Sequence, residues 1–422
     1  MSTLQPSASE RSMPWPTIAI GLAVMTLEGY DLVAFGATTP LLLRFQPWHL
    51  SIATLGMLGS LTPIGMLFGA LLVGQLTDRY GRRRTTLFSL AVVSLGMFAC
   101  VFAPGPELFG ASRFVVGLGV GAVYPAMGPL IFELAPAKRK NVSSAIVQCG
   151  VTTGGSLAAL VANLFLSGQN FRLEYLVGGG LGLMLLPMAF RWLPESPVYR
   201  RKQPGAPDGG LRLVTRPPYA GTTALFCLMV ICSFLLIFGI NTWLPQLMQA
   251  AHYPAGSSLT FLTLLNIGAT VGGLAIAVLA DRAGSKGPII ACFAVAAGAL
   301  IALSIKSSTA VLSAIVLIGG AGAFGVQGLI NVYLARSYPA RARASAIGVA
   351  LGIGRLGAIA GPALGGWILA ANFAPRWNFV LFAIPALLGA VLALAIGSRR
   401  LPQSPEETPA VRLAEEPAEP TQ

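Results

Sequence analysis

Charged residues are scarce in this chain of 422 residues: they form 10% of it, whereas 55% is hydrophobic. Soluble domains carry about a quarter charged residues, so this composition excludes an ordinary soluble domain and indicates a protein of the lipid bilayer. Only two histidines are present, His49 and His252, and a glycine-rich phosphate loop followed by Lys and Ser or Thr is lacking. These absences argue against a metal-dependent membrane enzyme and a nucleotide-driven pump.

Cysteine is also sparse, and its placement predicts no cofactor, metal or disulfide framework. The five cysteines lie in apolar stretches without metal-ligand spacing, so we interpret them as packing residues. They are Cys100, Cys149, Cys227, Cys232 and Cys292. The first apolar run, from about Trp15 to Leu43, is too long for the core of a cleavable signal peptide, so we expect it to stay as a span.

Long apolar runs dominate what is present. A helix needs roughly 20 apolar residues to cross a bilayer, and the sequence contains twelve such runs. We expect them to begin near residues 15, 52, 85, 110, 143, 174, 219, 258, 287, 310, 344 and 378. The sequence therefore predicts an all-α membrane protein with twelve transmembrane helices.

The distribution of basic residues predicts the orientation. If the N-terminus is cytoplasmic, only Arg44, Arg172, Lys306 and Arg376 among the Lys and Arg residues fall in outer loops. This asymmetry follows the positive-inside rule and predicts a bacterial inner-membrane protein with both termini in the cytoplasm. It also explains the formal net charge of +13, so we expect no nucleic-acid partner.

The chain repeats itself at an offset of 203 residues. The sequence DRYG at 78–81 recurs as DRAG at 281–284, and PAKRK at 136–140 recurs as PARAR at 339–343. Such a repeat predicts two six-helix halves with pseudo-symmetry. The expected division is a cytoplasmic tail at 1–13, the first half at 14–193, a cytoplasmic linker at 194–218, the second half at 219–398 and a disordered cytoplasmic tail at 399–422.

Ionisable residues in the middle of spans are candidates for function, because each is costly there unless it is paired or hydrated. Glu28 and Asp31 lie three residues apart, so both carboxylates share one helical face and repel each other when both are ionised. Arg355 is expected at a similar depth in the other half, where it pairs with these acids or binds a substrate carboxylate. A packing hydrogen bond and a structural ion pair remain as alternatives.

Two motifs resemble the major facilitator superfamily of transporters. Residues 74–84, GQLTDRYGRRR, are similar to the loop between its helices 2 and 3, and residues 113–119, RFVVGLG, to its helix 4 motif with Val116 in place of the usual glutamine. The resemblance implies two halves that rock around a site near the bilayer midplane. It also implies a role for Arg113 in proton coupling, although its depth alone allows a side chain that snorkels at the outer edge.

The same resemblance implies a cytoplasmic gate that closes the inner side of the outward-facing state. Its expected members in the two repeated loops are Asp78, Arg79, Arg82, Asp281 and Arg282. Glu133 ends helix 4 of this scheme, and we expect it to form a salt bridge on the inner side, with gating as a secondary role.

Three further motifs resemble the aromatic acid:proton symporter family. They are EGYD at 28–31, WLP at 243–245, and GRLGAI at 354–359 followed by GP at 361–362. The family usually has aspartate at the position of Glu28, but members resembling hydroxyphenylpropionate carriers have glutamate. The resemblance implies that a monomer imports an aromatic carboxylic acid, such as a hydroxybenzoate or a hydroxyphenylpropionate, together with protons.

Several alternatives remain open. Drug–proton antiporters typically have a Gly-Pro motif in helix 5, and Val151 after Gly150 favours symport over such an antiporter. A carrier for another organic anion or a sugar is the nearest alternative, because the fold does not specify its cargo. A membrane enzyme or a sensor that binds a ligand without moving it is the alternative from another class.

An aromatic anion needs one cation, apolar walls and ring-stacking partners. Around Arg355, the candidate ring partners in spans are Tyr30, Phe35, Tyr124, Phe324 and Tyr333, and the candidates for bonding ring hydroxyls are Gln148, Gln327 and Asn331. Ordinary helix packing is the alternative for each of them.

Overall fold

The computed structural model describes residues 15–135, 140–164, 170–196, 214–283, 285–371, 373 and 375–396. In this part of the chain, twelve helices are long and apolar enough to cross a membrane, and no strand is present. The predicted all-α class with twelve spans is therefore confirmed. Most helices begin up to four residues before the predicted start, because helical structure continues past the apolar core. Two of them, α4 and α13, begin at a proline, a residue that suits the first helical position.

The first six helices form the N-terminal half. They are α1 (Trp15–Arg44), α2 (Ile52–Tyr80), α3 (Arg82–Val101), α4 (Pro106–Leu134), α5 (Lys140–Leu164) and α6 (Arg172–Trp192). A short 3-10 helix, η1 (Gln46–Trp48), lies between α1 and α2. Only Gly81 separates α2 from α3, and its φ of 87° is in the left-handed region, which glycine adopts without a Cβ penalty.

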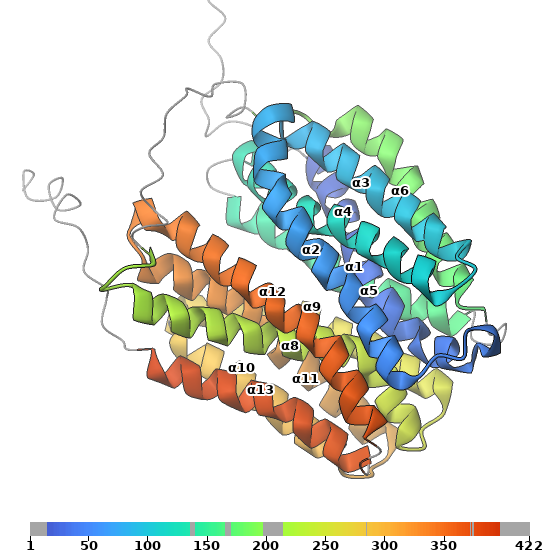
Figure 1. The fold of residues 1–422 in the computed structure, drawn as a ribbon. Coiled ribbons are helices and arrows are strands. Elements are labelled where there is room, and N and C mark those ends of the chain that lie inside the picture. Colours follow the sequence, from blue (N-terminus) through green and yellow to red (C-terminus); the bar gives the residue numbers. More distant parts are fainter. Residues whose placement is uncertain are drawn as a thin grey trace, which may run out of the picture.

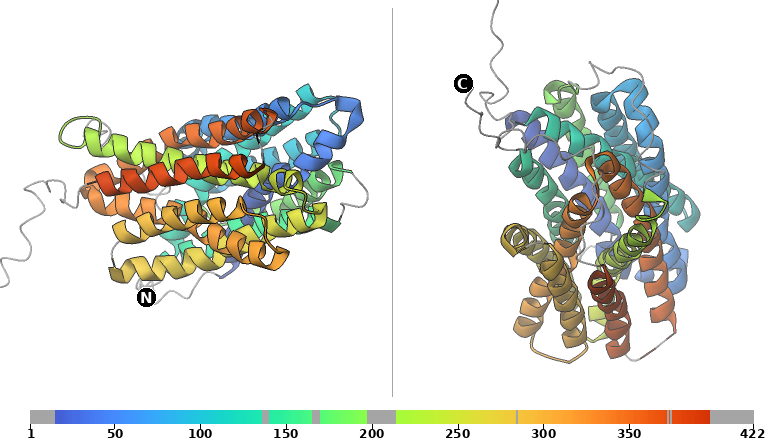
Figure 2. Two further views of the ribbon diagram at one scale, coloured as in Figure 1. Left: turned by 90° about the horizontal axis from the view of Figure 1, so that it is seen from below. Right: turned by 90° about the vertical axis from the view of Figure 1, so that its left-hand side faces the viewer.

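The second six helices repeat this arrangement. They are α8 (Ala220–Ala250), α9 (Ala255–Ala283), α10 (Lys286–Leu303), α11 (Thr309–Ser337), α12 (Ala340–Ala370) and α13 (Pro375–Ala395). In the first half α1 packs on α5, α2 on α4, and α3 on both α4 and α6. The equivalent pairs in the second half are α8 with α12, α9 with α11, and α10 with α11 and α13. The recurrence confirms the predicted pseudo-symmetric halves, whose helices run roughly along one direction (Figure 2).

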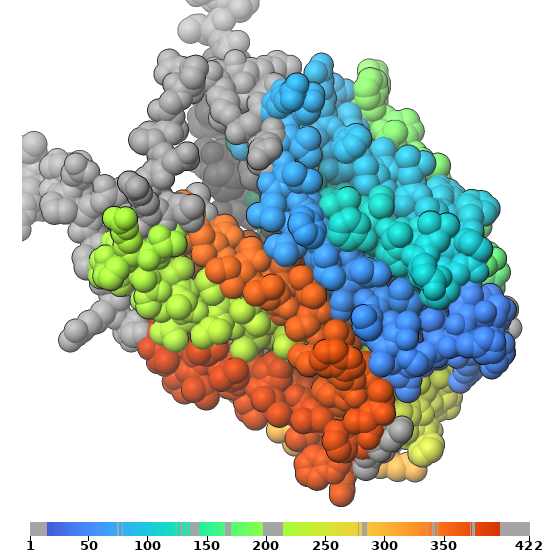
Figure 3. Space-filling model, in the orientation of Figure 1, coloured from blue at the N-terminus to red at the C-terminus, as the bar shows by residue number. Residues whose placement is uncertain are grey.

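The two halves meet along three helix pairs, α1 with α8, α2 with α12 and α5 with α9. Figure 1 shows α2 and α12 converging where α2 begins and α12 ends, and Figure 3 shows them in contact along the seam. We call this end of the molecule, where α1 finishes and α2 begins, the α1–α2 end. The other end, where α6 finishes and α8 begins, is the linker end.

Polar contacts tie the halves together toward the α1–α2 end. Thr270 of α9 donates to Thr152 of α5 at 2.6 Å, and Ser60 of α2 donates to the Ile359 carbonyl of α12 at 2.7 Å. Arg44 at the end of α1 donates to Gln249 near the end of α8 at 3.1 Å. Arg44, Gln249 and Ser60 lie in the parts of their helices nearer the α1–α2 end, and Thr152 lies at the middle of α5, so the halves are joined from mid-span to the α1–α2 end.

Two glycines allow helices of opposite halves to pack very closely. A Cβ atom at Gly36 of α1 would overlap the backbone carbonyl oxygen of Asn241 in α8, and one at Gly155 of α5 would overlap the Asn266 side chain of α9. Small residues let helix backbones come this near to each other. The seam at the α1–α2 end therefore depends on the absence of side chains at these two positions.

Candidate functional site

A buried ion pair lies inside the N-terminal half. Arg113 of α4 donates from Nη1 to Oδ1 of Asp31 in α1, and the two residues are 2% and 0% exposed. The Arg113 guanidinium also lies over the rings of Phe35, at 5.6 Å, and Tyr175, at 5.8 Å. This burial excludes the interpretation that Arg113 snorkels at an outer edge. A buried pair is costly to break, because removing one partner leaves the other charge uncompensated.

An aromatic cluster separates this ion pair from the α1–α2 end. Trp48 of η1 packs on Phe109 and Phe171 with ring centroids 5.5 and 5.2 Å apart, and Phe109 meets Tyr175 edge-on at 5.3 Å. The Trp48 indole donates to the Pro104 carbonyl at 3.0 Å, which fixes its position. The sequence analysis did not find this cluster, because its members come from η1, α4, α6 and the residue before α6.

Glu28 of α1 and Arg355 of α12 belong to opposite halves and are near enough for their charges to interact. Glu28 is 9% exposed, and the charge of Arg355 acts on it across the seam. Arg355 is half-buried: its Nη1 lies 3.5 Å from the Met66 sulfur of α2, and its guanidinium lies over the Phe234 ring of α8 at 5.5 Å. The seam thus holds one carboxyl group from α1 and one cation from α12.

The two acids of α1 therefore have different partners. The sequence analysis considered Arg355 as a partner for both, whereas the structure gives Asp31 to Arg113 and leaves Glu28 near Arg355. Positions three apart on an α-helix differ by about 60° around the axis. Because α1 packs against α4 and α6 on one side and α8 on another, this difference is enough to direct the carboxylates to separate neighbours.

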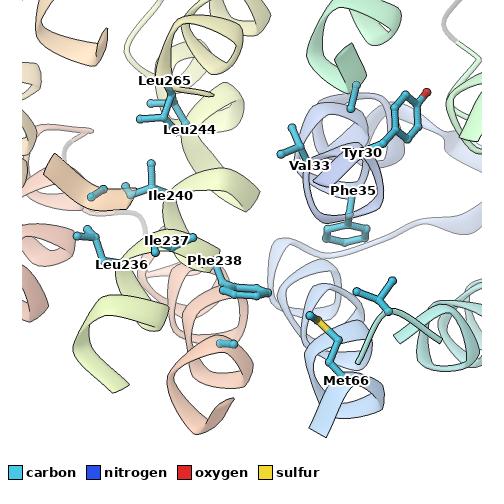
Figure 4. Close-up of a cluster of buried hydrophobic side chains, with 14 of the residues drawn as sticks. Tyr30, Val33, Phe35, Met66, Leu236, Ile237, Phe238, Ile240, Leu244 and Leu265 are labelled. Carbon is cyan, nitrogen blue, oxygen red and sulfur yellow. The ribbon is translucent and has the colours of Figure 1, made fainter. Parts of the chain in front are cut away.

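Two of the predicted ring partners lie within the N-terminal half. Tyr30 is fully buried, and its hydroxyl donates to the Glu174 carbonyl at 3.0 Å. Figure 4 shows this hydroxyl pointing away from Leu236, Ile240 and Leu244 of the C-terminal half. Phe35 is 2% exposed and covers Arg113. In this conformation both rings are buried within the N-terminal half, away from a ligand between the halves.

The other predicted binding residues are spread over α4, α5 and α11. Gln327 and Asn331 lie one turn apart on α11, are half-buried, and have buried amide atoms with no hydrogen-bond partner among the described residues. Phe324, one turn earlier on the same helix, is also half-buried. Gln148 of α5 is exposed, and the side chain of Tyr124 lies outside the described residues. Tyr333 packs edge-on against Phe226 of α8 at 5.3 Å.

A polar network at the linker end involves some of the predicted gate residues. Arg82 forms a salt bridge of 2.5 Å with Glu133, whose other oxygen accepts from Ser196 at 2.5 Å. Arg79 is exposed, and its guanidinium lies over the Tyr80 ring at 5.3 Å. The network joins the turn between α2 and α3 to the end of α4 and the residues after α6. The side chains of the three remaining predicted members, Asp78, Asp281 and Arg282, lie outside the described residues.

Comparison with known proteins identifies the family. The chain matches the Major Facilitator Superfamily over residues 19–354 and 329–420. It is 34% identical to the gentisate transporter of Corynebacterium glutamicum, covering 90% of this chain and 86% of that one. It is 31% identical to the 3-(3-hydroxy-phenyl)propionate transporter of Escherichia coli, with 88% and 90% covered, and 29% identical to the benzoate transport protein of Acinetobacter baylyi, with 92% and 91% covered.

Solved structures agree with this assignment at the level of the fold. A D-xylose–proton symporter superposes with a TM-score of 0.75 at 18% identity, covering 93% of this chain and 99% of that one. A bacterial homolog of the lysosomal transporter Spinster, in an inward-facing conformation, superposes with a TM-score of 0.76 at 17% identity, with 92% and 98% covered. The chain belongs to the Major Facilitator Superfamily, and it is a membrane-spanning transporter and not an enzyme.

Proposed function

We propose that this transporter imports an aromatic carboxylic acid together with protons across the bacterial inner membrane, acting as a monomer with both termini in the cytoplasm. The relatives named for gentisate, benzoate and 3-(3-hydroxy-phenyl)propionate support the substrate class. The observation that carries the proposal is the position of Arg355 of α12 on the seam, against Met66 of α2, at a depth in its half similar to that of Glu28 in α1. One cation that serves an acid and a substrate anion in turn links proton binding to substrate binding.

The proposed cycle follows from this competition. While Glu28 is ionised, Arg355 is attracted to it across the seam. A proton on Glu28 removes that attraction, and the guanidinium becomes available for a two-pronged contact with the substrate carboxylate. Asp31, held by Arg113, is the second proton-coupling acid of the cycle. The loaded protein then rocks from one open state to the other, and loss of the proton and substrate resets it.

The proposed substrate carries a hydroxylated ring. Gln327 and Asn331 support this, because buried amide groups without partners are costly unless a ligand or water bonds them. Their spacing of one helical turn suits the edge of a single ring with a polar substituent. Phe324 from the same helix, with Tyr124 and Gln148 from the other half, completes the proposed binding surface around Arg355.

The proposed gate lies at the linker end, which is cytoplasmic in this orientation. Its members are Asp78, Arg79, Arg82, Glu133, Asp281 and Arg282. The salt bridge between Arg82 and Glu133 supports a fixed position for the turn between α2 and α3. In the outward-facing state, this turn and its repeat at 281–284 are proposed to approach each other and close the inner side.

Uptake into liposomes tests the proposed function. The purified protein is reconstituted, and uptake of labelled benzoate, 4-hydroxybenzoate, gentisate, 3-hydroxyphenylpropionate and a xylose control is measured with and without an inward proton gradient. We expect accumulation of at least one aromatic acid above its external concentration, only with the gradient, and none of xylose. Accumulation of xylose, or of no aromatic acid by protein that still shows its native thermal transition, contradicts the proposal.

Replacement of Arg355 tests the anion contact. We expect Arg355→Ala to raise KM for the transported acid by about 10- to 100-fold, since a charge-assisted hydrogen bond contributes about 1.5–3 kcal/mol. Arg355→Lys keeps the charge but lacks the fork geometry, so its KM is expected to lie between that of wild type and that of Arg355→Ala. Arg376→Ala, which removes an exposed arginine at the start of α13, is the matched control and is expected to leave KM unchanged. An unchanged KM in Arg355→Ala contradicts the assignment.

A further inference from the structure

Glu174, in the first turn of α6, is a buried carboxyl group that the proposed cycle does not use. It is 1% exposed, its side-chain oxygens form no hydrogen bond of good geometry with the described residues, and the Tyr30 hydroxyl lies beside them. Acids in the first turn of a helix often accept bonds from free backbone N–H groups, but the oxygens of Glu174 make no such bond. Burying an ionised carboxylate without a hydrogen-bond donor costs free energy, so a proton on Glu174 stabilises this conformation.

Two tyrosines connect the surroundings of Glu174 to those of Asp31. Tyr30 immediately precedes Asp31 in α1, and its hydroxyl donates to the Glu174 carbonyl at 3.0 Å. Tyr175 immediately follows Glu174 in α6, and its hydroxyl lies 3.1 Å from the Thr38 hydroxyl of α1 while its ring lies against Arg113. The two carboxyl groups therefore belong to one buried polar cluster inside the N-terminal half.

The ionisable groups around Glu174 and its two tyrosine neighbours, Tyr30 and Tyr175, come from four helices. They are Asp31 of α1, Cys100 of α3, Arg113 of α4, and Arg172, two residues before Glu174 in α6. The described side chains of α5, which also touches α6, include no acidic, basic or tyrosine residue. Asp31 is thus the other carboxyl group of the cluster, and its second oxygen, Oδ2, has no hydrogen-bond partner among the described residues.

The position of this cluster separates it from the seam between the halves. Glu174 lies three residues after Phe171, at the α1–α2 end. Asn170, which immediately precedes Phe171, is exposed to solvent. Figure 4 shows the Tyr30 hydroxyl on the side of α1 away from the C-terminal half. A proton that moves from Glu174 to Asp31 therefore stays within the N-terminal half and avoids the space where Arg355 and the substrate meet.

We propose that Glu174 is a further proton-binding site, which takes protons from water at the α1–α2 end and supplies them to Asp31 within the buried cluster that also contains Tyr30 and Tyr175. In this step the O–H bond at Glu174 breaks and an O–H bond at Asp31 forms. Glu174 is then reprotonated from the water at that end. The inference rests on the proposed proton-coupled transport and assigns to it a proton route distinct from the substrate route.

The test uses Glu174→Gln in liposomes and the acid from the panel above that the wild type accumulates fastest. Gradient-driven uptake is measured at external pH values from 5.5 to 8, and counterflow exchange, which needs no net proton movement, is measured beside it. We expect Glu174→Gln to lose at least about tenfold in gradient-driven rate and to flatten its pH profile, because a positioned acid contributes at least this much to proton transfer. Counterflow is expected to stay within about twofold of wild type.

Three further proteins complete this test. Glu107→Gln changes an exposed first-turn acid of α4 at the same end and is expected to behave as wild type. Tyr30→Phe removes the hydroxyl that neighbours both Glu174 and Asp31, and it is expected to slow gradient-driven uptake but not counterflow. Glu174→Asp keeps a carboxyl group and is expected to retain the pH profile, which separates proton transfer from packing.

Two results overturn the inference without touching the proposed function. The first is a wild-type rate and pH profile in Glu174→Gln, because the amide imitates a neutral acid that serves only packing. The second is an equal loss of counterflow in Glu174→Gln and Glu174→Asp, which makes the role structural. A wild-type protein that transports without any proton dependence instead contradicts the proposed coupling, and the inference about Glu174 falls with it.

Discussion

Replacement of Asp31 by Asn is expected to abolish accumulation driven by a proton gradient. Asn cannot bind and release the transported proton, and it also leaves Arg113 as an uncompensated charge in a fully buried site. Breaking such a pair costs about 3–5 kcal/mol. The measurement is the ratio of internal to external substrate in liposomes with an inward proton gradient, together with the thermal unfolding transition of the purified variant.

A double variant separates loss of coupling from loss of folding. In Asp31→Asn with Arg113→Gln both charges are removed, so most of the lost stability is expected to return while accumulation stays absent. The conservative Asp31→Glu keeps a carboxyl group and is expected to retain some accumulation. Full concentrative uptake by the single Asp31→Asn variant would remove Asp31 from the coupling role.

Replacement of Gly36 by Leu is expected to stop transport by preventing the halves from closing at the α1–α2 end. Any Cβ at this position overlaps the Asn241 backbone oxygen, and two helix backbones cannot yield as a flexible side chain does. Closure of this end is one of the two states that alternate during transport. We expect both gradient-driven uptake and counterflow to fall at least about 100-fold, which corresponds to about 2.7 kcal/mol against the closed state.

The position of the halves is measured directly in the same variant. Spin labels at Gln46 of η1 and Lys306 between α10 and α11, two exposed positions in opposite halves, report the separation at the α1–α2 end in a background without cysteine. We expect Gly36→Leu to shift the distance distribution to longer values. Gly298→Leu, at an exposed glycine of α10 with open space around it, is the matched control. Wild-type transport by Gly36→Leu shows that this contact is not needed for closure.

The two acids of α1 differ in what their environments allow. Asp31 is buried inside the N-terminal half beside its own arginine, which the Phe35 ring covers, so its charge changes affect the packing of that half. Glu28 lies near the seam, so its charge changes affect the attraction between the halves through Arg355. We therefore expect substitutions of Asp31 to reduce stability more than the equivalent substitutions of Glu28.

The spans were predictable from the sequence because their cause is local. A run of roughly 20 apolar residues contains the information that it crosses a bilayer, whatever its neighbours are. The repeated DRYG and DRAG loops likewise predicted two equivalent halves, and the packing pairs of α1–α6 recur in α8–α13. The helix ends differ from the predicted ones by a few residues, because capping and proline placement, and not apolarity, decide where a helix begins.

Glu28, Asp31, Arg113 and Arg355 could be found from the sequence alone, since the cost of a charge inside the bilayer makes every such residue stand out from its apolar surroundings. Which carboxylate pairs with which arginine could not be predicted from the sequence. Whether a carboxylate on α1 meets Arg113 or Arg355 depends on how α1 is rotated between α4, α6 and α8, which is a property of packing between distant segments.

The sequence by itself determined the class of the protein, its twelve helices, its repeat and the small set of ionisable groups at depth, because these follow from composition and spacing along one chain. Only the tertiary structure decided the buried pair of Asp31 and Arg113, the aromatic cluster around Trp48, and the neighbours of Glu174. An acid in the first turn of a helix is unremarkable in sequence, because its charge suits the helix N-terminus. Its burial beside Tyr30 arises from α6 packing against α1, which no local pattern encodes.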